Sequence, residues 1–520
     1  MLNPSIQTVE VLLKYAVDCG LIYDIDKTQA RNQLYHLLGY ELGNIDDSGF
    51  DCTPPNDGIG SVKDILTALS DCYSSRGLFD EDTPTARELL ETAIMGIFTP
   101  RTSFVSRIFN EKRVKSPQDA TNYFYTLCSD IHYIKSKPDD KKLFWAEETE
   151  FGKIQLSINL TKPEKDPRDI AKAGQAVATS YPKCLLCLEN MGFWGNYAWP
   201  ARQNLISLPV ILAGDTWYFQ YSPYTYYDEH CIVFSRIHEP IRVEMETFNR
   251  LVDFVEQFPH YFIGSNADLP IVGGSILSHD HFQGGRYTFP IEHAAPLHFF
   301  KHELFSHITI SLIKWPLSVI RLSINDAAPY NEAKAQLVKI AGYILRLWKG
   351  YTDEESGIYA QTDGTPHNAV TAIARMNKNK LLEMDLVLRN NRTSNEHPLG
   401  IFHPHSQWHH IKKENIGLIE VMGLAILPGR LKDELLSLES ILAGDIADLS
   451  QSHSHHKPWL DEMLAHYGTV NDASSAKSII KQEVGRIFVN VLKDCGVFKW
   501  DENGEERFLH FMAKIGCGKL

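Results

Sequence analysis

The chain has 520 residues, of which 43% are hydrophobic and 11% aromatic, and its formal net charge is -14. This length and composition predict a globular protein of two to four domains and exclude an intrinsically disordered chain. A chain this acidic repels phosphate backbones at long range, which argues against nucleic acid as a partner.

Localisation signals are weak along the sequence. No run of about 18 apolar residues occurs, so we expect no membrane span. The first twenty residues lack a basic region before an apolar run, so they read as an amphipathic helix rather than a signal peptide. Nine cysteines in this length are typical of a reducing compartment. We therefore expect a cytoplasmic protein.

The first 150 residues predict a helical accessory region. Apolar residues recur at three-to-four spacing in 6–17, 27–40 and 85–98. Between them, 46–60 is dense in Asp, Gly and Pro and predicts a loop.

Strand-like segments begin at about residue 150. Alternating, aromatic-rich or β-branched stretches predict strands at 152–160, 216–236, 307–324, 380–393 and 415–427. Helical patterns interrupt these strands at 245–258 and 333–351, and helices return at 429–442, 458–468 and 476–496. The pattern predicts an α+β body between helical ends.

The stretch GGSILSHDHFQGG, residues 273–285, carries the strongest chemical signal. On a strand, His279, His281 and Gln283 would form one row on one face. Flanking glycines allow close approach of a ligand and leave N–H groups free for phosphate. Histidine can ligate a metal or act as a nucleophile, and glutamine can donate to a developing oxyanion. Two hydrogen-bonded histidines beside a turn are the plainer alternative.

Cys184 and Cys187 have the C-x₂-C spacing of half a zinc site. A second C-x₂-C is absent, so histidines would have to complete the site, with His230, His238 and His279 as nearby candidates. A redox dithiol lacks a surrounding thioredoxin-like pattern, and two free core cysteines remain an alternative.

A third cluster, IFHPHSQWHHIKKENIG, begins at residue 401. A second metal site, a basic rim for a phosphorylated ligand and an idle histidine patch are all consistent with it. His403-x-His405-x-Gln repeats the first motif 124 residues later, so either chance or a duplicated fold unit explains the match.

The long strings FPHYFIGSNADLPIVGGSILSHDHFQGG and HHIKKENIGLIEVMGLAILPGRL resemble UDP-glucose–hexose-1-phosphate uridylyltransferases of the histidine-triad superfamily. The similarity is to the second, longer bacterial type, and it is strong over about 180–435. The resemblance implies an α+β fold of duplicated triad-like antiparallel sheet halves with added helical segments at both ends. The expected divisions are 1–150, 151–300 with the catalytic motif, 301–430, and a helical 431–520.

The resemblance also implies a mechanism. His281 attacks the α-phosphorus of UDP-glucose, glucose-1-phosphate leaves, and galactose-1-phosphate takes the uridylyl group in ping-pong fashion. Gln283 stabilises the phosphoryl oxygens, and the backbone carbonyl of His279 orients the nucleophilic ring. Enzymes of the first type are dimers, so a homodimer is an open expectation.

Metal ligands carry over from the first type of the family. Its structural zinc corresponds to Cys184, Cys187, His238 and His279 here. A second metal in that type falls near His403 and His405, with Glu292 as a further candidate ligand.

Substrate contacts carry over less directly. Asn266 and Ser275 match the residues that hold ribose and phosphate, and Asn204 resembles an asparagine near the uridine. The glutamate that follows Gly-Tyr in the first type is absent, because this chain has Leu424 and Ala425 there. The candidates for the sugar phosphate are Arg202, Arg389, Arg392 and Lys413.

Three alternatives stay open at this point. The acceptor could be an N-acetylhexosamine-1-phosphate. The chain could be a triad-type nucleotide hydrolase, or a zinc-stabilised nucleotide binder without catalysis.

Overall fold

The computed structural model describes residues 4–40, 61–135, 142–159, 168, 172, 181–445, 449–470 and 472–520. The loop predicted at 46–60 lies outside these residues. Among the described residues, no helix is long and apolar enough to cross a membrane.

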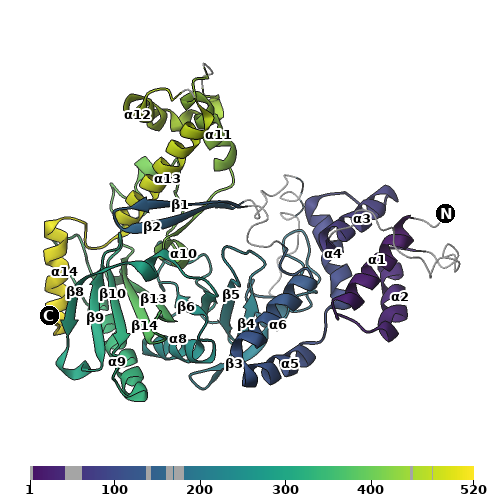
Figure 1. The fold of residues 1–520 in the computed structure, drawn as a ribbon, viewed down its shortest axis with the longest axis horizontal. Coiled ribbons are helices and arrows are strands. Elements are labelled where there is room, and N and C mark those ends of the chain that lie inside the picture. Colours follow the sequence, from purple (N-terminus) through teal and green to yellow (C-terminus); the bar gives the residue numbers. More distant parts are fainter. Residues whose placement is uncertain are drawn as a thin grey trace.

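Helices form the N-terminal region, at one end of the molecule (Figure 1). They are α1 (Pro4–Asp18), α2 (Lys27–Leu37), α3 (Val62–Ser75), α4 (Pro84–Phe98), α5 (Thr102–Lys115) and α6 (Pro117–Asp130). Ser61 and Thr83 begin α3 and α4 because their hydroxyls accept from backbone N–H groups that the helix leaves unpaired. Phe109 and Phe124 then pack on Phe219 of the central sheet, which fixes α5 and α6 to it.

The predicted helical region ends earlier than residue 150. Strand β1 (Lys142–Thr149) pairs antiparallel with β2 (Gly152–Asn159), and β15 (Leu424–Leu427) adds to β2 in parallel. The stretch 415–427, predicted as one strand, divides into the short helix α10 (Leu418–Val421) and β15. A short apolar run fits either element, so local pattern could not separate them.

An eleven-stranded sheet forms the centre of the molecule, and its neighbouring strands pair antiparallel. The sheet order is β16-β8-β9-β10-β14-β13-β6-β7-β5-β4-β3. The bounds are β3 (Leu208–Leu212), β4 (Asp215–Tyr221), β5 (Cys231–Ser235), β6 (Phe262–Ser265), β7 (His281–Gly285), β8 (Pro296–Lys301), β9 (Ile308–Ile313), β10 (Val319–Ile324), β13 (Asn368–Met376), β14 (Leu382–Asn390) and β16 (Gly518–Lys519). The predicted α+β class with antiparallel strands is confirmed.

The sheet contains one unit twice. Strands β3, β4 and β5, helix α8 (Met245–Gln257), and strands β6 and β7 follow one another, with sheet order 3-4-5-7-6. Strands β8, β9 and β10, helix α9 (Tyr330–Lys349), and strands β13 and β14 repeat this path, with order 8-9-10-14-13. The units join where β6 pairs with β13. Because β8 begins the second unit, the boundary predicted at residue 300 falls within that strand.

Two layers cover the sheet. The apolar sides of α8 and α9 pack on one face, together with Phe282, Ile263 and Leu386. The β1-β2-β15 sheet, α10 and α13 (Ala473–Cys495) share a second core with residues of the opposite face, such as Phe262 and Val387. The site predicted from the motif at 279–283 belongs to this second face, because His281 and Gln283 alternate with Phe282.

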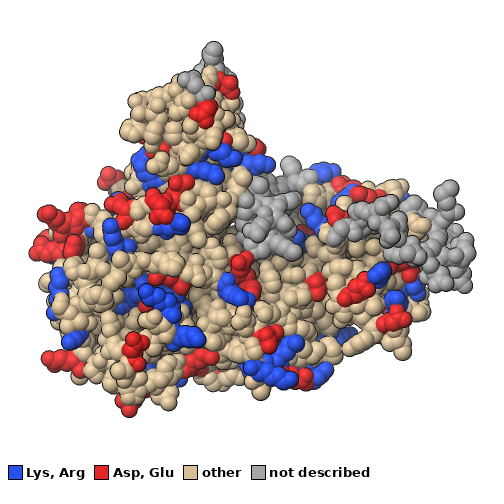
Figure 2. All heavy atoms as spheres, viewed as in Figure 1, with Lys and Arg blue, Asp and Glu red and all other residues tan. Residues whose placement is uncertain are grey.

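Helices return at the C-terminus, as predicted. They are α11 (Leu431–Leu442), α12 (Lys457–Tyr467), α13 and α14 (Glu502–Ile515). Helices α11 and α12 and the first part of α13 project from the body, whereas α14 packs at the far edge of the sheet (Figure 1). Figure 2 shows acidic and basic side chains interspersed over the drawn face, without a continuous basic stripe.

A buried ionic network lies on the second unit of the sheet. Asp385, which is fully buried, accepts from Arg321 Nε at 2.7 Å and from Arg375 Nη2 at 2.9 Å. Replacing Asp385 with alanine leaves two guanidinium groups buried without their shared partner. We expect a loss of about 3–5 kcal/mol in the free energy of unfolding, measured by denaturant titration. Asp461→Ala, which removes an exposed pair with Lys457, should cost less than about 1 kcal/mol.

Candidate active site

His281 opens strand β7 and is buried. Its Nδ1 lies 2.8 Å from the carbonyl oxygen of His279, and because a carbonyl only accepts, Nδ1 carries the proton. The lone pair is then on Nε2, which makes no hydrogen bond with another described residue. Burial lowers the pKa of His281 to about 4, so the ring is neutral at pH 7. A buried neutral imidazole held in one tautomer is suited to nucleophilic attack.

A cleft of about 710 Å³ opens in front of His281. Gln283, Asn266, Ser275 and Arg202 also line it. Gln283 Oε1 and Asn266 Nδ2 are buried without a partner among the described residues, whereas Asn266 Oδ1 accepts from the N–H of Leu418. Unpaired amide atoms in a cleft wall are costly unless a ligand satisfies them. These residues therefore offer a nucleophile, two unpaired amide atoms, a hydroxyl and a guanidinium to a bound molecule.

Cys184, Cys187, His238 and His279 come together next to the residues that precede β7, and we call them the Cys–His cluster. Cys184 Sγ lies 3.5 Å from Cys187 Sγ and 3.2 Å from His279 Nδ1, and Cys187 Sγ lies 3.2 Å from His238 Nδ1. A tetrahedral ion with bonds of about 2.0–2.3 Å has ligand atoms separated by roughly 3.3–3.8 Å. The cluster therefore has the donor set and the spacing of a metal site.

His279 connects the two sites. Its Nδ1 belongs to the Cys–His cluster, while its Nε2 lies 2.8 Å from the carbonyl oxygen of Ser235. A metal-ligating histidine commonly donates its other N–H to such a carbonyl, which fixes the ring. The carbonyl of the same residue holds His281. An ion in the cluster would thus fix the residue that orients the cleft imidazole.

Comparison with known proteins identifies the family. The model of the galactose-1-phosphate uridyl transferase N-terminal domain matches residues 45–240, and that of the C-terminal domain matches 253–458. This chain belongs to the galactose-1-phosphate uridyl transferase family. Galactose-1-phosphate uridylyltransferase of Caldanaerobacter subterraneus subsp. tengcongensis is 48% identical, with 98% of each chain covered. The enzymes of that name from Staphylococcus carnosus (49%, covering 93% of this chain and 96% of that one) and Bacillus subtilis (44%, 98% of each) are similar too.

The row predicted for His279, His281 and Gln283 is partly wrong. The strand begins at His281, so His279 precedes it and turns its ring to the Cys–His cluster. Of the three residues in the predicted row, His281 and Gln283 line the cleft and His279 does not. His279 contributes there through its backbone carbonyl, as the resemblance implied.

Several predicted substrate residues lie elsewhere. Asn204 is buried and donates its amide to the carbonyl of Ile131, where it holds the end of α6. Arg389 is buried against the carbonyl of Ile416, Arg392 binds the carbonyl of Gly357, and Lys413 is exposed. None of these four lines the cleft. Arg202 is the only arginine among the described residues that line the cleft.

The second metal predicted near His403 and His405 finds no support. His403 Nε2 contacts Asn415, and His405 contacts the carbonyl of Ile401. Glu292 instead faces Arg375, at 3.6 Å. Among the described residues these groups do not form a set of three ligand atoms within 4.8 Å.

The match between the two His-x-His-x-Gln stretches does not follow the duplicated unit. Strand β14 takes the place of β7 in the second unit, whereas His403–Gln407 lies in the loop after β14 and enters a short 3-10 helix (Ser406–Trp408). The fold is duplicated, but this second motif is not the copy of the first.

Sequence reasoning missed a polar and aromatic wall. Tyr133, Tyr224, Tyr226, Gln220 and Asn415 line the cleft. The run YSPYTYY signalled only strand propensity, although aromatic rings with hydroxyls also suit a nucleoside and a sugar.

A glycine allows the cleft wall to close on Asn266. A Cβ at Gly274 would lie 2.8 Å from Asn266 Nδ2, closer than real contacts allow. We expect Gly274→Ala to displace the amide and lower kcat/KM by about 10²-fold, since a shift of about 1 Å at a site has such effects. Gly350→Ala is the control, because its Cβ meets nothing closer than 3.9 Å. Steady-state kinetics of both variants check this expectation.

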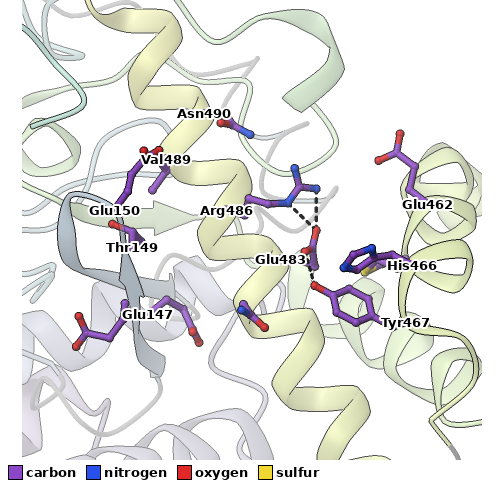
Figure 3. Close-up of a pocket in the computed structure, with 13 residues that line it drawn as sticks. Glu147, Thr149, Glu150, Glu462, His466, Tyr467, Glu483, Arg486, Val489 and Asn490 are labelled. Atoms are coloured by element: carbon purple, nitrogen blue, oxygen red, sulfur yellow. Dashed lines mark hydrogen bonds and ion pairs between the residues drawn. The ribbon is translucent and has the colours of Figure 1, made fainter. Parts of the chain in front are cut away.

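Another hollow, of about 560 Å³, lies between β1 and helices α12 and α13 (Figure 3). Glu147, Glu150, Glu462 and Glu483 face it, and Glu483 pairs with Arg486 at 2.7 Å. Carboxylates in this number repel a sugar phosphate. The cleft at His281 is therefore the candidate active site.

Proposed function

We propose that this chain transfers UMP from UDP-glucose to galactose-1-phosphate, giving UDP-galactose and glucose-1-phosphate, through a covalent uridylyl-His281. Relatives 44–49% identical over nearly full length carry the name of this activity. The single observation that carries the chemistry is the 2.8 Å hydrogen bond from His281 Nδ1 to the carbonyl of His279, which leaves Nε2 with the lone pair.

In the first half-reaction, Nε2 of His281 attacks the α-phosphorus of UDP-glucose. A P–N bond forms and the P–O bond to the β-phosphate breaks, so glucose-1-phosphate leaves with its electron pair. The ring then carries positive charge, because Nδ1 keeps its proton, and the carbonyl of His279 stabilises that charge. Gln283, opposite Ile232 on β5, is positioned to hold a phosphoryl oxygen through its amide.

In the second half-reaction, a phosphate oxygen of galactose-1-phosphate attacks the same phosphorus. The P–N bond breaks, His281 regains its lone pair, and UDP-galactose leaves. The phosphoramidate conserves the energy of the phosphoanhydride between the two steps, so neither step needs an external energy source. Asn266 and Ser275 bind the nucleotide part in this proposal, in agreement with their place in the cleft wall.

Zinc is the ion that we propose for the Cys–His cluster. Two thiolates and two imidazoles in a closed set are typical of structural zinc, since no position is left for substrate. When bound, zinc would cross-link the segment at Cys184–Cys187, the loop after β5 that carries His238 and the residue His279 just before β7. The cluster and the carbonyl of Ser235 then fix the ring of His279, and with it the backbone carbonyl that orients His281.

Arg202 is the proposed contact for the sugar phosphate. It lines the cleft, and its Nη1 bonds only the neighbouring carbonyl of Ala201 among the described residues. We expect Arg202→Ala to raise KM for galactose-1-phosphate about tenfold or more, because a charge-assisted contact is worth roughly 1.5–3 kcal/mol. Arg202→Lys should recover part of this loss. An unchanged KM in both variants would contradict the assignment.

The test of the whole proposal is the reaction in two separate halves. Wild-type protein with UDP-glucose alone should release at most one glucose-1-phosphate per site and gain a uridylyl-sized mass. Adding galactose-1-phosphate should discharge the adduct. Continuous release of UMP without acceptor would establish the hydrolase instead, and binding without an adduct would establish a nucleotide binder. If an N-acetylhexosamine-1-phosphate discharged the adduct faster than galactose-1-phosphate, it would be identified as the acceptor instead.

We place this reaction in the cytoplasm. The described cysteines are all free, and Cys184 and Cys187 are 3.5 Å apart rather than bonded. Free thiols are typical of a reducing compartment.

A further inference from the structure

A second group of histidines gathers around one carboxylate, away from the cleft. Glu434 on α11 has its Oε2 2.9 Å from Nε2 of His456 and 3.6 Å from Nε2 of His455. Both histidines end the 3-10 helix Gln451–His456, directly before α12. The three ligand atoms lie within 4.8 Å of one another. Helix α11, which carries Glu434, and helix α12, which follows the two histidines, lie in the part that projects from the body (Figure 1).

His410 approaches the same place from the loop after β14. Its ring centroid is 5.4 Å from that of His456, and the ring planes cross at 86°. The corresponding values for His238 and His279 in the Cys–His cluster are 5.0 Å and 65°. The His410 ring therefore lies beside the His456 ring, although His410 is outside the set of three whose ligand atoms lie within 4.8 Å of one another. We call Glu434, His455, His456 and His410 the histidine–glutamate cluster.

Two ring nitrogens of this cluster are left unsatisfied. His456 is fully buried, and its Nδ1 has no hydrogen-bond partner among the described residues, nor has Nε2 of His410. Buried polar atoms without partners are rare and costly, so each indicates a missing partner. A ring nitrogen that carries no proton has a lone pair, and that lone pair can bind a metal.

Arg430 shares the carboxylate. Its Nη1 donates to Oε2 of Glu434 at 2.5 Å, and its Nη2 donates to the carbonyl of His410 at 3.2 Å. The guanidinium neutralises Glu434 when the imidazoles stand alone. With an ion present, it can keep the carbonyl of His410 while Glu434 offers a lone pair to the ion. His455, which is exposed, gives solvent ions access.

We propose that Glu434, His455 and His456, completed by His410, bind a divalent transition-metal ion of the zinc class at a site separate from the Cys–His cluster. Imidazole nitrogens with one carboxylate are the donor set that zinc and nickel favour over magnesium or calcium.

The ion would join α11, the start of α12 and the loop that carries His410. Two residues after His410, Lys412 binds Glu420 at 3.0 Å, and Glu420 lines the cleft. The ion would therefore cross-link the projecting helices to the loop that leads to the cleft wall.

The test uses the full chain, stripped with a chelator and titrated with Zn²⁺ or Co²⁺. Wild type should bind two ions per chain, and Co²⁺ separates them. Only the ion in the Cys–His cluster gives a thiolate-to-metal charge-transfer band. Glu434→Gln and His455→Ala should retain that band and lose the other ion, with affinity weakened at least about tenfold. His466→Ala is the matched control, because it removes an exposed histidine of α12 outside the cluster.

His455 is exposed, so its replacement tests the site without disturbing the core. Cys187→Ser should show the opposite pattern, with one ion bound and no charge-transfer band. Binding of a single, thiolate-type ion by wild type would overturn the proposal. Two ions in both Glu434→Gln and His455→Ala would overturn it as well.

Discussion

His281→Asn is expected to abolish uridylyl transfer, with kcat lowered by at least about 10³-fold. In the proposed reaction, the imidazole of His281 is the protein group that forms a bond to phosphorus. Asparagine is close to it in size and retains a polar group near the carbonyl of His279, but its amide nitrogen has no available lone pair. The variant should therefore bind UDP-glucose and fail to form the adduct. Intact-protein mass after mixing with UDP-glucose measures this directly.

The control for this variant is His466→Asn, which changes an exposed histidine far along the chain. It should form the adduct like wild type. Both variants should unfold at the wild-type temperature and bind the same amount of metal, which excludes a general loss of structure. A uridylyl adduct that persists on His281→Asn would show that another residue is the nucleophile.

Cys187→Ser is expected to empty the Cys–His cluster and to lower both stability and activity. Cys187 Sγ lies 3.2 Å from His238 Nδ1 and 3.8 Å from His279 Nδ1, so it contacts both histidine ligands of the cluster. Binding of a structural zinc ion contributes about 10 kcal/mol or more to folding in small zinc domains. We expect the melting temperature to fall by several degrees and kcat to fall, because the backbone of His279 loses its anchor.

Three readouts separate these effects. Co²⁺ charge transfer reports the thiolate site, differential scanning calorimetry reports the melting temperature, and the adduct assay reports the chemistry. Cys72→Ser is the matched control, since Cys72 is a half-buried free cysteine on α3. A Cys187→Ser protein with unchanged metal content and melting temperature would contradict the assignment of the cluster.

The spacing of apolar residues correctly predicted helices and strands that bury one face. The apolar stripe of 245–258 gave α8, and the alternation of 152–160 gave β2, because burial of one face imposes its period on the residues. His281 and Gln283 were singled out by the contiguous motif between glycines, whereas Asn266 and Ser275 came from the resemblance, and all four line the cleft. The four members of the Cys–His cluster come together as the resemblance implied.

Other assignments failed because they depend on contacts distant in sequence. Asn204 was predicted for the cleft, but its side chain satisfies the carbonyl of Ile131 at the end of a helix 73 residues away. Lys413 and its buried neighbour Lys412 look alike in sequence, and only the fold decides that Lys412 turns inward to Glu420. His279 left the predicted row because the strand starts two residues later. The type of residue shows which chemistry a side chain can perform, whereas tertiary packing decides which site that side chain faces.

The two units of the duplicated sheet differ in the side chains that they present on the face of the cleft. In the second unit, Glu383 and Asp385 lie on β14, on the same face of the sheet as His281 and Gln283 on β7, since Phe282 and Met384 share the opposite core. Glu383 accepts from Arg375 at 2.6 Å and Asp385 is held by two arginines, so this face presents closed ion pairs. The second unit therefore presents paired charges on the face where the first unit presents His281 and Gln283. In the proposed reaction one histidine of each chain carries the nucleotide, so titration with donor should reach its end point at one equivalent per chain.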